Sequence, residues 1–303
     1  MEAMQTKSKY AIEARGLGKK YRSFWALKDC NISIPKGSVT ALVGPNGAGK
    51  TTLLKLLTSL NRPSAGSMIV LGQEPAQNAE YLSNIGYVAQ EIPLYDQFSA
   101  KDHFALGAHM DSHWDNDLAV ERLQELRIPL DRPVGKLSGG QRAQVGLAMA
   151  LAKKPKLLLL DEPVAALDPL ARVDFLTSLA QAVADAEGEL TVVMSSHLLS
   201  DLERVCDRVI ILAAGETQLC DDIEQVLKTH KMLVGPPGKL PSSSDYTIIK
   251  EARSSTSAHV LVRLNTSKLD LPHWHVRDVD IEEIVLAYMG QNREGASVKG
   301  DTK

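Results

Sequence analysis

The sequence predicts an α/β fold in which short buried strands alternate with helices and form a mostly parallel sheet. Val39–Val43 is an apolar, β-branched run, and a glycine-rich stretch and a segment of helical composition, Thr51–Leu60, follow it directly. Leu157–Leu160 is a second buried run, and it also lies between two helical patterns. Strands that alternate with helices in this way pack as a parallel sheet covered by the helices.

The first half of the chain contains an expected insertion. Ile32–Ile34 alternates as a short strand does. Over about residues 91–133 polar and aromatic residues mix, and Leu118–Arg127 has helical periodicity. Gly139–Lys154 then has the pattern of one helix. We therefore expect an inserted, mostly helical subdomain over about residues 91–150.

The second half continues the alternation and changes in composition beyond about residue 225. The expected elements are a helix at Phe175–Glu187, strands at Leu190–Met194 and Val209–Leu212, loops at Gly235–Gly238 and Pro241–Ser244, strands at Thr247–Lys250 and His259–Leu264, and a short helix at Ile281–Met289. We therefore predict a main domain over residues 1–225, a small α/β or β-rich C-terminal domain over 226–290 and a disordered polar tail over 291–303.

Composition excludes several classes of function. The 303 residues carry 34 Lys and Arg against 37 Asp and Glu, so the net charge of −3 provides no basic field for nucleic acid. Cys30, Cys206 and Cys220 have no metal-ligand or CxxC spacing, and we expect free thiols. Residues 1–10 are polar, which indicates no signal peptide, and the apolar runs are much shorter than the roughly 20 residues of a membrane span. A role at a membrane would therefore require a partner.

The most specific motif is a phosphate-binding loop. Its residues, Gly44, Pro45, Asn46, Gly47, Ala48, Gly49, Lys50 and Thr51, match G-x-x-x-x-G-K-[ST] between an expected strand and helix. Glycines let backbone N–H groups approach phosphate oxygens, and the helix N-terminus faces the same phosphates. We expect Lys50 to reach the β- and γ-phosphates and the Thr51 hydroxyl to bind Mg²⁺.

A second anion-binding motif follows at Ser138, Gly139, Gly140 and Gln141, directly after Leu137. Ser138 is a good N-cap for the helix that starts there. A helix N-terminus with two glycines can bind a phosphate, yet the chain already has a phosphate loop. We therefore expect this second site to face a nucleotide held by another chain.

An acidic pair lies at the end of the Leu157–Leu160 strand. Asp161 would hold Mg²⁺, mostly through water, and Glu162 would orient and polarise the attacking water. An isolated Asp-Glu pair would more simply be a solvated strand end. Its position after a buried strand, about twenty residues beyond the second motif, favours the catalytic interpretation.

Four motifs follow one another along the chain, namely the phosphate loop, Leu137–Gln141, Asp161-Glu162 and a later Ser195-Ser196-His197. In this order they resemble the nucleotide-binding domain of the ABC ATPase family over about residues 10–220. The resemblance implies a P-loop NTPase core with a mostly parallel sheet, an antiparallel β subdomain and an inserted helical subdomain. It implies ATP and Mg²⁺ as ligands, with each ATP lying between Gly44–Thr52 of one chain, Thr52 included, and Ser138–Gln141 of the other.

The resemblance also assigns roles to isolated residues. Tyr21 corresponds to the aromatic residue that stacks on adenine, with Phe24 and Trp25 nearby as alternatives. Gln90 corresponds to the glutamine that touches Mg²⁺ or the hydrolytic water and senses the membrane partner. His197 corresponds to the switch histidine that contacts the γ-phosphate.

Asp168 corresponds to the aspartate at the dimer seam, although Ala165 and Ala166 precede it where the family often has Ser or Thr. No comparable motif supports a role for the remaining histidines of the helical region, His103, His109 and His113, and we expect them at the surface.

The expected function is that of an ATP-hydrolysing subunit on the cytoplasmic face of the plasma membrane. Two copies would form a head-to-tail dimer around two ATP molecules and drive a separate membrane-spanning permease, with no nucleic acid involved. A groove near Tyr95, Phe98 and Phe104 could receive a helix of the permease, or these aromatics could be core. The stretch from Gln90 to Phe98 and the added C-terminal part look more like bacterial drug or antibiotic exporters of the ABC-2-like type than like nutrient importers. The alternatives are an importer ATPase and a soluble ABC protein acting on ribosomes or nucleic acid.

Overall fold

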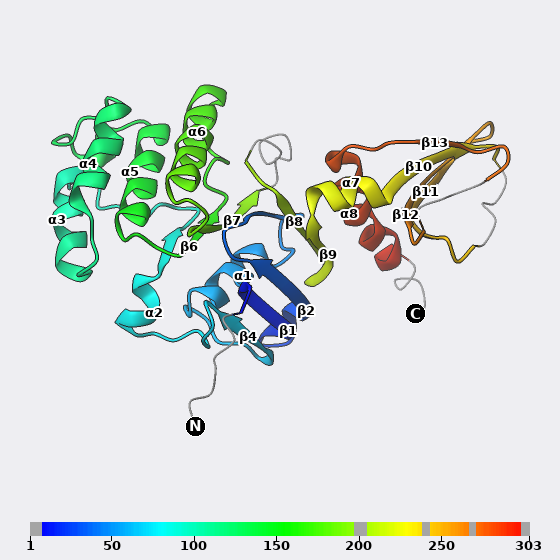
Figure 1. Cartoon of the computed structure of the whole chain (residues 1–303), viewed down its shortest axis with the longest axis horizontal. Helices are drawn as coiled ribbons and strands as arrows, with labels where there is room; N and C mark the ends of the chain where they lie inside the picture. The colour runs from blue at the N-terminus through cyan, green and yellow to red at the C-terminus, as the bar shows by residue number, and fades with distance from the viewer. Residues whose placement is uncertain (1–7, 197–204, 238–242, 267–270, 298–303) are drawn as a thin grey trace.

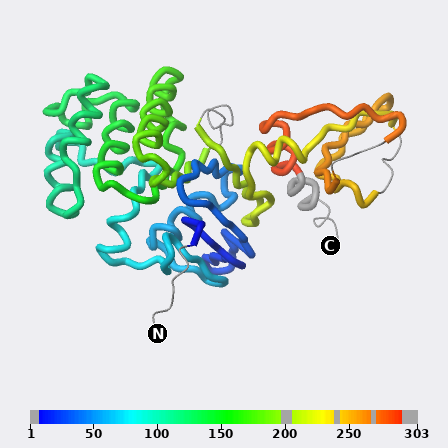
Figure 2. Tube along the Cα trace, in the orientation of Figure 1, coloured from blue at the N-terminus to red at the C-terminus, as the bar shows by residue number. Residues whose placement is uncertain are grey.

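The computed structural model describes residues 8–196, 205–237, 243–266 and 271–297, and only the backbone of residues 291–297. Figure 1 shows a group of helices at one end, two sheets in the centre and a C-terminal module at the other end. The tube in Figure 2 follows the same path from the N-terminal sheet through the helices to that module. Within the described ranges, no helix has the length and apolar character needed to cross a bilayer.

The central sheet has six strands and confirms the predicted parallel α/β core. Across the sheet they are β5 (Ile85–Val88), β6 (Leu157–Asp161), β7 (Thr191–Ser196), β3 (Val39–Val43), β8 (Arg208–Ala213) and β9 (Glu216–Asp222). All neighbours pair in parallel except β9, which runs antiparallel to β8. Every residue of β3, β6 and β7 is buried, because both faces of the sheet are covered.

The two faces of this sheet have different covers. Leu157 and Leu159 point to the side of α1 (Lys50–Leu57), whereas Leu158 and Leu160 point to the opposite side. On the α1 side lies the expected antiparallel sheet, in the order β2 (Phe24–Pro35), β1 (Tyr10–Tyr21) and β4 (Ala65–Val70). A short helix, α2 (Ala79–Ser83), leads from β4 into β5.

Helices form a layer at one end of the molecule (Figure 1). They are α3 (Ala100–Met110), α4 (Asn116–Glu125), the single 3-10 turn Val134–Lys136, α5 (Gly139–Ala152) and α6 (Pro169–Asp185). Helices α5 and α6 cover the second face of the central sheet, and α3 and α4 pack on α5 around Phe104 and Leu123. Helix α6 begins six residues before the predicted Phe175, because the Asp168 carboxylate caps it and Pro169 suits its first turn.

His103 corrects one expectation from the sequence, since it is buried with 2% exposure and is not a surface residue. Its Nδ1 lies 2.8 Å from the Ser99 carbonyl oxygen, and its Nε2 accepts a hydrogen bond from the Tyr95 backbone N–H at 3.0 Å. Both ring nitrogens are therefore satisfied inside the helical layer.

The C-terminal module contains α7 (Ile223–Thr229), β10 (His230–Gly235), β11 (Tyr246–Arg253), β12 (Ala258–Leu264), β13 (His275–Arg277) and α8 (Ile281–Ser297). Its sheet is antiparallel, in the order β11-β12-β10-β13. Ile284 and Val285 of α8 belong to the same core as Val209 and Ile211 of β8. Helix α8 continues to Ser297, into the stretch expected to be a disordered tail, because the residues after Met289 include good helix formers that extend an existing helix.

A buried histidine joins two parts of this module. His230 is 1% exposed, its Nδ1 lies 2.8 Å from the Val226 carbonyl oxygen and its Nε2 lies 2.9 Å from the Tyr288 hydroxyl oxygen. A carbonyl oxygen can only accept, so Nδ1 carries the proton and Nε2 of the neutral ring accepts from Tyr288. Burial, assisted by the positive charge of Arg263, lowers the pKa of His230 below its ordinary value, against the opposing effects of the Val226 carbonyl and Asp221.

The buried neutral His230 predicts a loss of stability in acid. Below about pH 6.5 the unfolded chain binds a proton at this residue that the folded chain excludes, so the free energy of unfolding falls as the pH falls. Chemical denaturation between about pH 7.5 and about pH 5.5 should therefore show a steeper loss for the wild type than for His230→Gln. Equal pH slopes in the two proteins would contradict the assignment.

Candidate functional site

The phosphate loop has the strand-loop-helix geometry that its motif requires, since it connects the end of β3 to the start of α1. Gly49 has a φ of 104°, and a Cβ there would lie 2.6 Å from the Ala26 carbonyl oxygen. At Gly44 a Cβ would lie 2.3 Å from the Leu212 carbonyl oxygen. The loop therefore needs glycine at both positions to keep its shape.

Lys50 is buried inside this loop with 5% exposure. Its Nζ donates to the Gly44 carbonyl oxygen at 2.8 Å and lies 3.5 Å from the Pro45 carbonyl oxygen. The same Nζ is 3.2 Å from Oε1 of Glu162, which forms an ion pair with it. The structure thus brings together the phosphate-binding lysine and the predicted catalytic base.

Asp161 lies at the carboxyl end of β6 with 1% exposure. Its Oδ1 accepts a hydrogen bond from the Thr51 hydroxyl at 3.1 Å and another from the Ser195 hydroxyl at 2.9 Å. The Ser195 oxygen in turn accepts the backbone N–H of Glu162 at 2.9 Å. Sequence reasoning named Ser195 only within the Ser195-Ser196-His197 motif and gave it no role of its own. The available signal was its place at the end of a buried strand, two residues before His197.

The Thr51 hydroxyl and the Asp161 carboxylate fit Mg²⁺. Both are oxygen ligands, the two groups lie within hydrogen-bond distance of each other, and Mg²⁺ is commonly held by one or two protein oxygens together with substrate phosphates. Among the described residues, no set of three His, Cys, Asp or Glu side chains converges as a metal site of its own. Gln90 follows the end of β5, the strand beside β6, which places it at the same edge of the sheet.

Tyr87 of β5 also lies near this edge. Burial and, to a smaller extent, the negative charge of Asp161 raise the pKa of Tyr87 to about 12. The phenol is therefore neutral at physiological pH and lies within the electric field of the Asp161 carboxylate.

The second anion-binding motif forms the N-terminus of α5. The Ser138 side chain accepts from the Gln141 N–H at 3.2 Å, and the Gln141 side chain accepts from the Ser138 N–H at 3.1 Å. A Cβ on Gly140 would lie 2.7 Å from that of Ala171, so packing within the chain requires this glycine. Gly139 meets only Leu167 Cδ2 at 3.9 Å, and packing among the described residues does not require a glycine there.

Two other predicted site residues, Asp168 and Tyr21, each have their own contacts. Asp168 caps α6, its Oδ1 accepting from the backbone N–H groups of Leu170 at 3.1 Å and Ala171 at 3.0 Å. Tyr21 ends β1, where its hydroxyl accepts from the Asn61 side chain at 2.7 Å and Lys19 Nζ lies 5.1 Å from its ring centroid. His197 lies outside the described residues.

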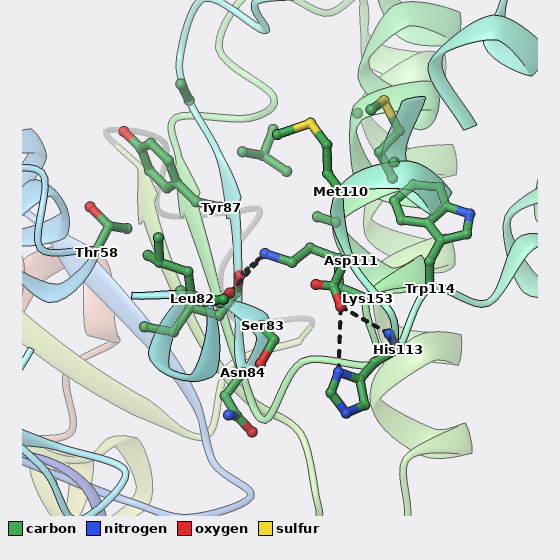
Figure 3. A pocket seen from close by; sticks show the side chains of 18 of the residues that line it. Thr58, Leu82, Ser83, Asn84, Tyr87, Met110, Asp111, His113, Trp114 and Lys153 are labelled. Atoms are coloured by element: carbon green, nitrogen blue, oxygen red, sulfur yellow. Dashed lines mark hydrogen bonds and ion pairs between the residues drawn. The ribbon is translucent and has the colours of Figure 1, made fainter. Parts of the chain in front are cut away.

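The aromatic residues proposed to line a groove divide between two environments. Phe104 is core with 1% exposure, whereas Tyr95 and Phe98 are exposed and pack against each other with ring centroids 5.2 Å apart. A groove of about 860 Å³ instead lies between the helical layer and β5, and none of these three aromatic residues lines it. Leu82, Tyr87, Met110, Trp114 and Lys153 are among the side chains around it in Figure 3.

Lys153 is one of the residues that line this groove. Its Nζ donates to the carbonyl oxygens of Leu82 and Ile85, both at 2.8 Å (Figure 3 shows this contact). Burial lowers the pKa of this lysine. The contact connects the end of α5 to the segment that leads into β5.

Comparison with known proteins identifies relatives. The family model described as ABC transporter matches residues 27–165. The sulfate/thiosulfate import ATP-binding protein CysA of Pseudomonas aeruginosa is 35% identical over 214 residues, which cover 68% of this chain and 64% of that protein. CysA of Synechococcus elongatus is 33% identical over 77% of this chain and 70% of its own length. The uncharacterized ABC transporter ATP-binding protein YcbN of Bacillus subtilis is 34% identical, with 68% and 67% covered. This chain thus spans slightly less than two thirds of the length of the Pseudomonas relative.

Solved structures agree in fold. CbiO1 from Clostridium perfringens, described as part of the ABC transporter complex cbiONQ, matches with a TM-score of 0.62 and 26% identity over 72% of this chain and 91% of that one. The ATP-binding cassette MJ0796, in a dimeric post-hydrolysis state bound to ADP and Pi, matches with a TM-score of 0.62 and 25% identity over 70% and 98%. With its phosphate loop, acidic strand end and these relatives, the chain belongs to the ABC transporter ATP-binding family.

Proposed function

We propose that this chain binds ATP with Mg²⁺, hydrolyses it, and thereby powers transport by a separate membrane-spanning subunit. The observation that carries the proposal is the meeting of Lys50, Thr51, Asp161 and Glu162 at one edge of the central sheet. These are the groups that phosphoryl transfer to water needs, namely a cation for the phosphates, oxygen ligands for the metal and a carboxylate for the water.

Each residue has a distinct task in this scheme. Lys50 exchanges the Gly44 and Pro45 carbonyl oxygens and the Glu162 carboxylate for the β- and γ-phosphates. The Glu162 carboxylate, released from the lysine, accepts a proton from the attacking water. Thr51 and Asp161 would hold Mg²⁺, which supplies charge neutralisation at the phosphates.

The second anion-binding motif supports a dimer. Among the described residues, a Cβ on Gly139 would meet only Leu167 Cδ2 at 3.9 Å, which leaves room for another molecule to approach the Ser138 helix N-terminus. We propose a head-to-tail dimer in which Ser138–Gln141 of one copy contacts the γ-phosphate bound by the other. Tyr21 would stack on adenine, while Asp168, Gln90 and His197 would act at the seam, at the metal and at the γ-phosphate. A dimeric solved relative supports this arrangement.

The direction of transport is a separate part of the proposal. The sequence led us to expect a drug or antibiotic exporter, and the relatives do not support that subtype. Those relatives whose names state a cargo are sulfate and thiosulfate importers, and import is the direction that these names favour.

The groove beside β5 is the proposed docking site for the membrane-spanning subunit. Leu82, Met110 and Trp114 give it apolar walls of a kind suited to a short amphipathic helix. Tyr87 lines the groove on β5, which pairs with β6, the strand that ends at Asp161, so a helix seated there would lie one strand away from the proposed metal-binding carboxylate. This groove replaces the Tyr95–Phe104 surface as our docking site.

The base assignment predicts the behaviour of Glu162→Gln. Phosphate release should fall by about 10²–10⁴-fold, because the amide cannot accept the proton of the water. ATP binding should persist, and size-exclusion chromatography with ATP should show a trapped dimer. The matched control is Glu189→Gln, which neutralises an exposed glutamate before β7 and should keep wild-type turnover. Normal hydrolysis by Glu162→Gln would refute the assignment.

The docking assignment predicts the behaviour of Met110→Asp. Met110 is 79% exposed at the groove, and a carboxylate there would be buried unpaired under the docked helix. With the membrane-spanning subunit that co-purifies with the wild-type chain as the binding partner, affinity should fall at least about tenfold, while the ATPase rate of the isolated chain stays unchanged. Ile248→Asp, at an exposed position on β11, is the control. Equal binding by both variants would exclude this groove.

A further inference from the structure

Ser195 lies where the two acidic residues of the site meet the neighbouring strand. It is the fifth residue of β7, it is fully buried, and it pairs with Asp161 in the parallel ladder between β6 and β7. Its hydroxyl donates to Asp161 Oδ1 at 2.9 Å and accepts the Glu162 N–H at 2.9 Å. One side chain therefore holds both acidic residues of the proposed reaction, Asp161 and Glu162.

We propose that Ser195 is a positioning residue for ATP hydrolysis, which orients the Asp161 carboxylate toward the metal and fixes the backbone that aims Glu162. This inference rests on the proposed function. Ser195 touches neither nucleotide nor water in this scheme, and it acts through its two neighbours.

The effect on Asp161 follows from the number of donors. Thr51 and Ser195 both donate to Oδ1, which fixes the rotation of the carboxylate about its own axis. In the proposed reaction the Thr51 hydroxyl turns to the metal, which leaves Ser195 as the donor that maintains the carboxylate orientation. Groups of this kind that hold metal ligands change metal affinity or activity by about 10–100-fold when removed.

The effect on Glu162 follows from its backbone. Glu162 has a φ of 48°, a left-handed conformation that non-glycine residues seldom adopt. The hydrogen bond from its N–H to Ser195 helps to hold this conformation at the point where β6 ends. The same turn directs the Glu162 side chain to within 3.2 Å of Lys50 Nζ, and therefore toward the position of the terminal phosphate.

A buried serine can also be no more than a polar group of the core, and the neighbouring strand offers a control for the loss of a buried hydroxyl as such. Thr40 of β3 is fully buried in the same sheet, and its hydroxyl has no hydrogen-bond partner in the described part of the chain. Thr40→Val removes this buried hydroxyl and leaves the site untouched. It therefore measures the effect of losing a hydroxyl from the sheet.

The test compares Ser195→Ala, Ser195→Thr and Thr40→Val in the full chain. For Ser195→Ala we expect kcat to fall and the Mg²⁺ concentration for half-maximal rate to rise, each by about 10–100-fold. The KM for ATP should stay within about twofold, because the phosphate loop is intact. Ser195→Thr keeps the hydroxyl and should restore most of the rate, and Thr40→Val should match the wild type.

A second readout needs no turnover. Hydrogen exchange of the Glu162 amide in nucleotide-free protein should be faster in Ser195→Ala than in the wild type and Thr40→Val, because the amide loses its acceptor. A wild-type protein without ATPase activity would refute the proposed function, while this exchange difference would still test the positioning. Unchanged kcat, Mg²⁺ dependence and Glu162 exchange in Ser195→Ala would overturn the role of Ser195, as would equal losses in Thr40→Val.

Discussion

The burial of opposite charges at the carboxyl edge of the central sheet is the constraint on which the site depends. Lys50 and Asp161 are 5% and 1% exposed, and Glu162 pairs with the lysine. Removing charges from water is costly, and a buried ion pair adds little net stability to a fold. The parallel order of β6, β7 and β3 brings these groups to one edge of the sheet. We attribute this arrangement to the proposed ATP hydrolysis and not to a gain in the stability of the chain.

The ion pair would also shape the proposed nucleotide binding. ATP would meet a phosphate loop whose lysine is already satisfied by carbonyl oxygens and a carboxylate, so binding would replace one set of oxygen ligands with another. The net affinity would be the difference between the two sets. In the proposed reaction, Glu162 would return to Lys50 once the γ-phosphate has left, which would favour release of the product.

Local signals explain how much of the fold the sequence could predict. Strands β3 and β6 are continuous apolar runs, and α5 begins at a capping box of Ser138 and Gln141, so their positions follow from neighbouring residues. Strand β1 is not a continuous apolar run, and its irregular shape has no local sequence signal. Gly16 within it has a φ of 56°, and the pairing register with β2 shifts around this residue. His103 has a surface-like sequence context, and its burial depends on where α3 packs in the helical layer.

The same distinction applies to the site. Lys50, Thr51, Asp161 and Glu162 belong to contiguous motifs, and the structure brings them together as their order suggests. The contact between Ser195 and Asp161 spans 34 residues of sequence and arises from the register of β6 against β7. No local sequence pattern predicts the register of β6 against β7.

The shared core of α8 and the central sheet has a mechanical consequence. Val285 of α8 and Ile211 of β8 lie in one hydrophobic cluster, and β8 is the direct neighbour of the strand that leads into the phosphate loop. Hydrophobic packing of side chains therefore attaches the C-terminal module to the central sheet. A substitution that opens a cavity in this cluster would therefore disturb contacts of the C-terminal module and of the central sheet together.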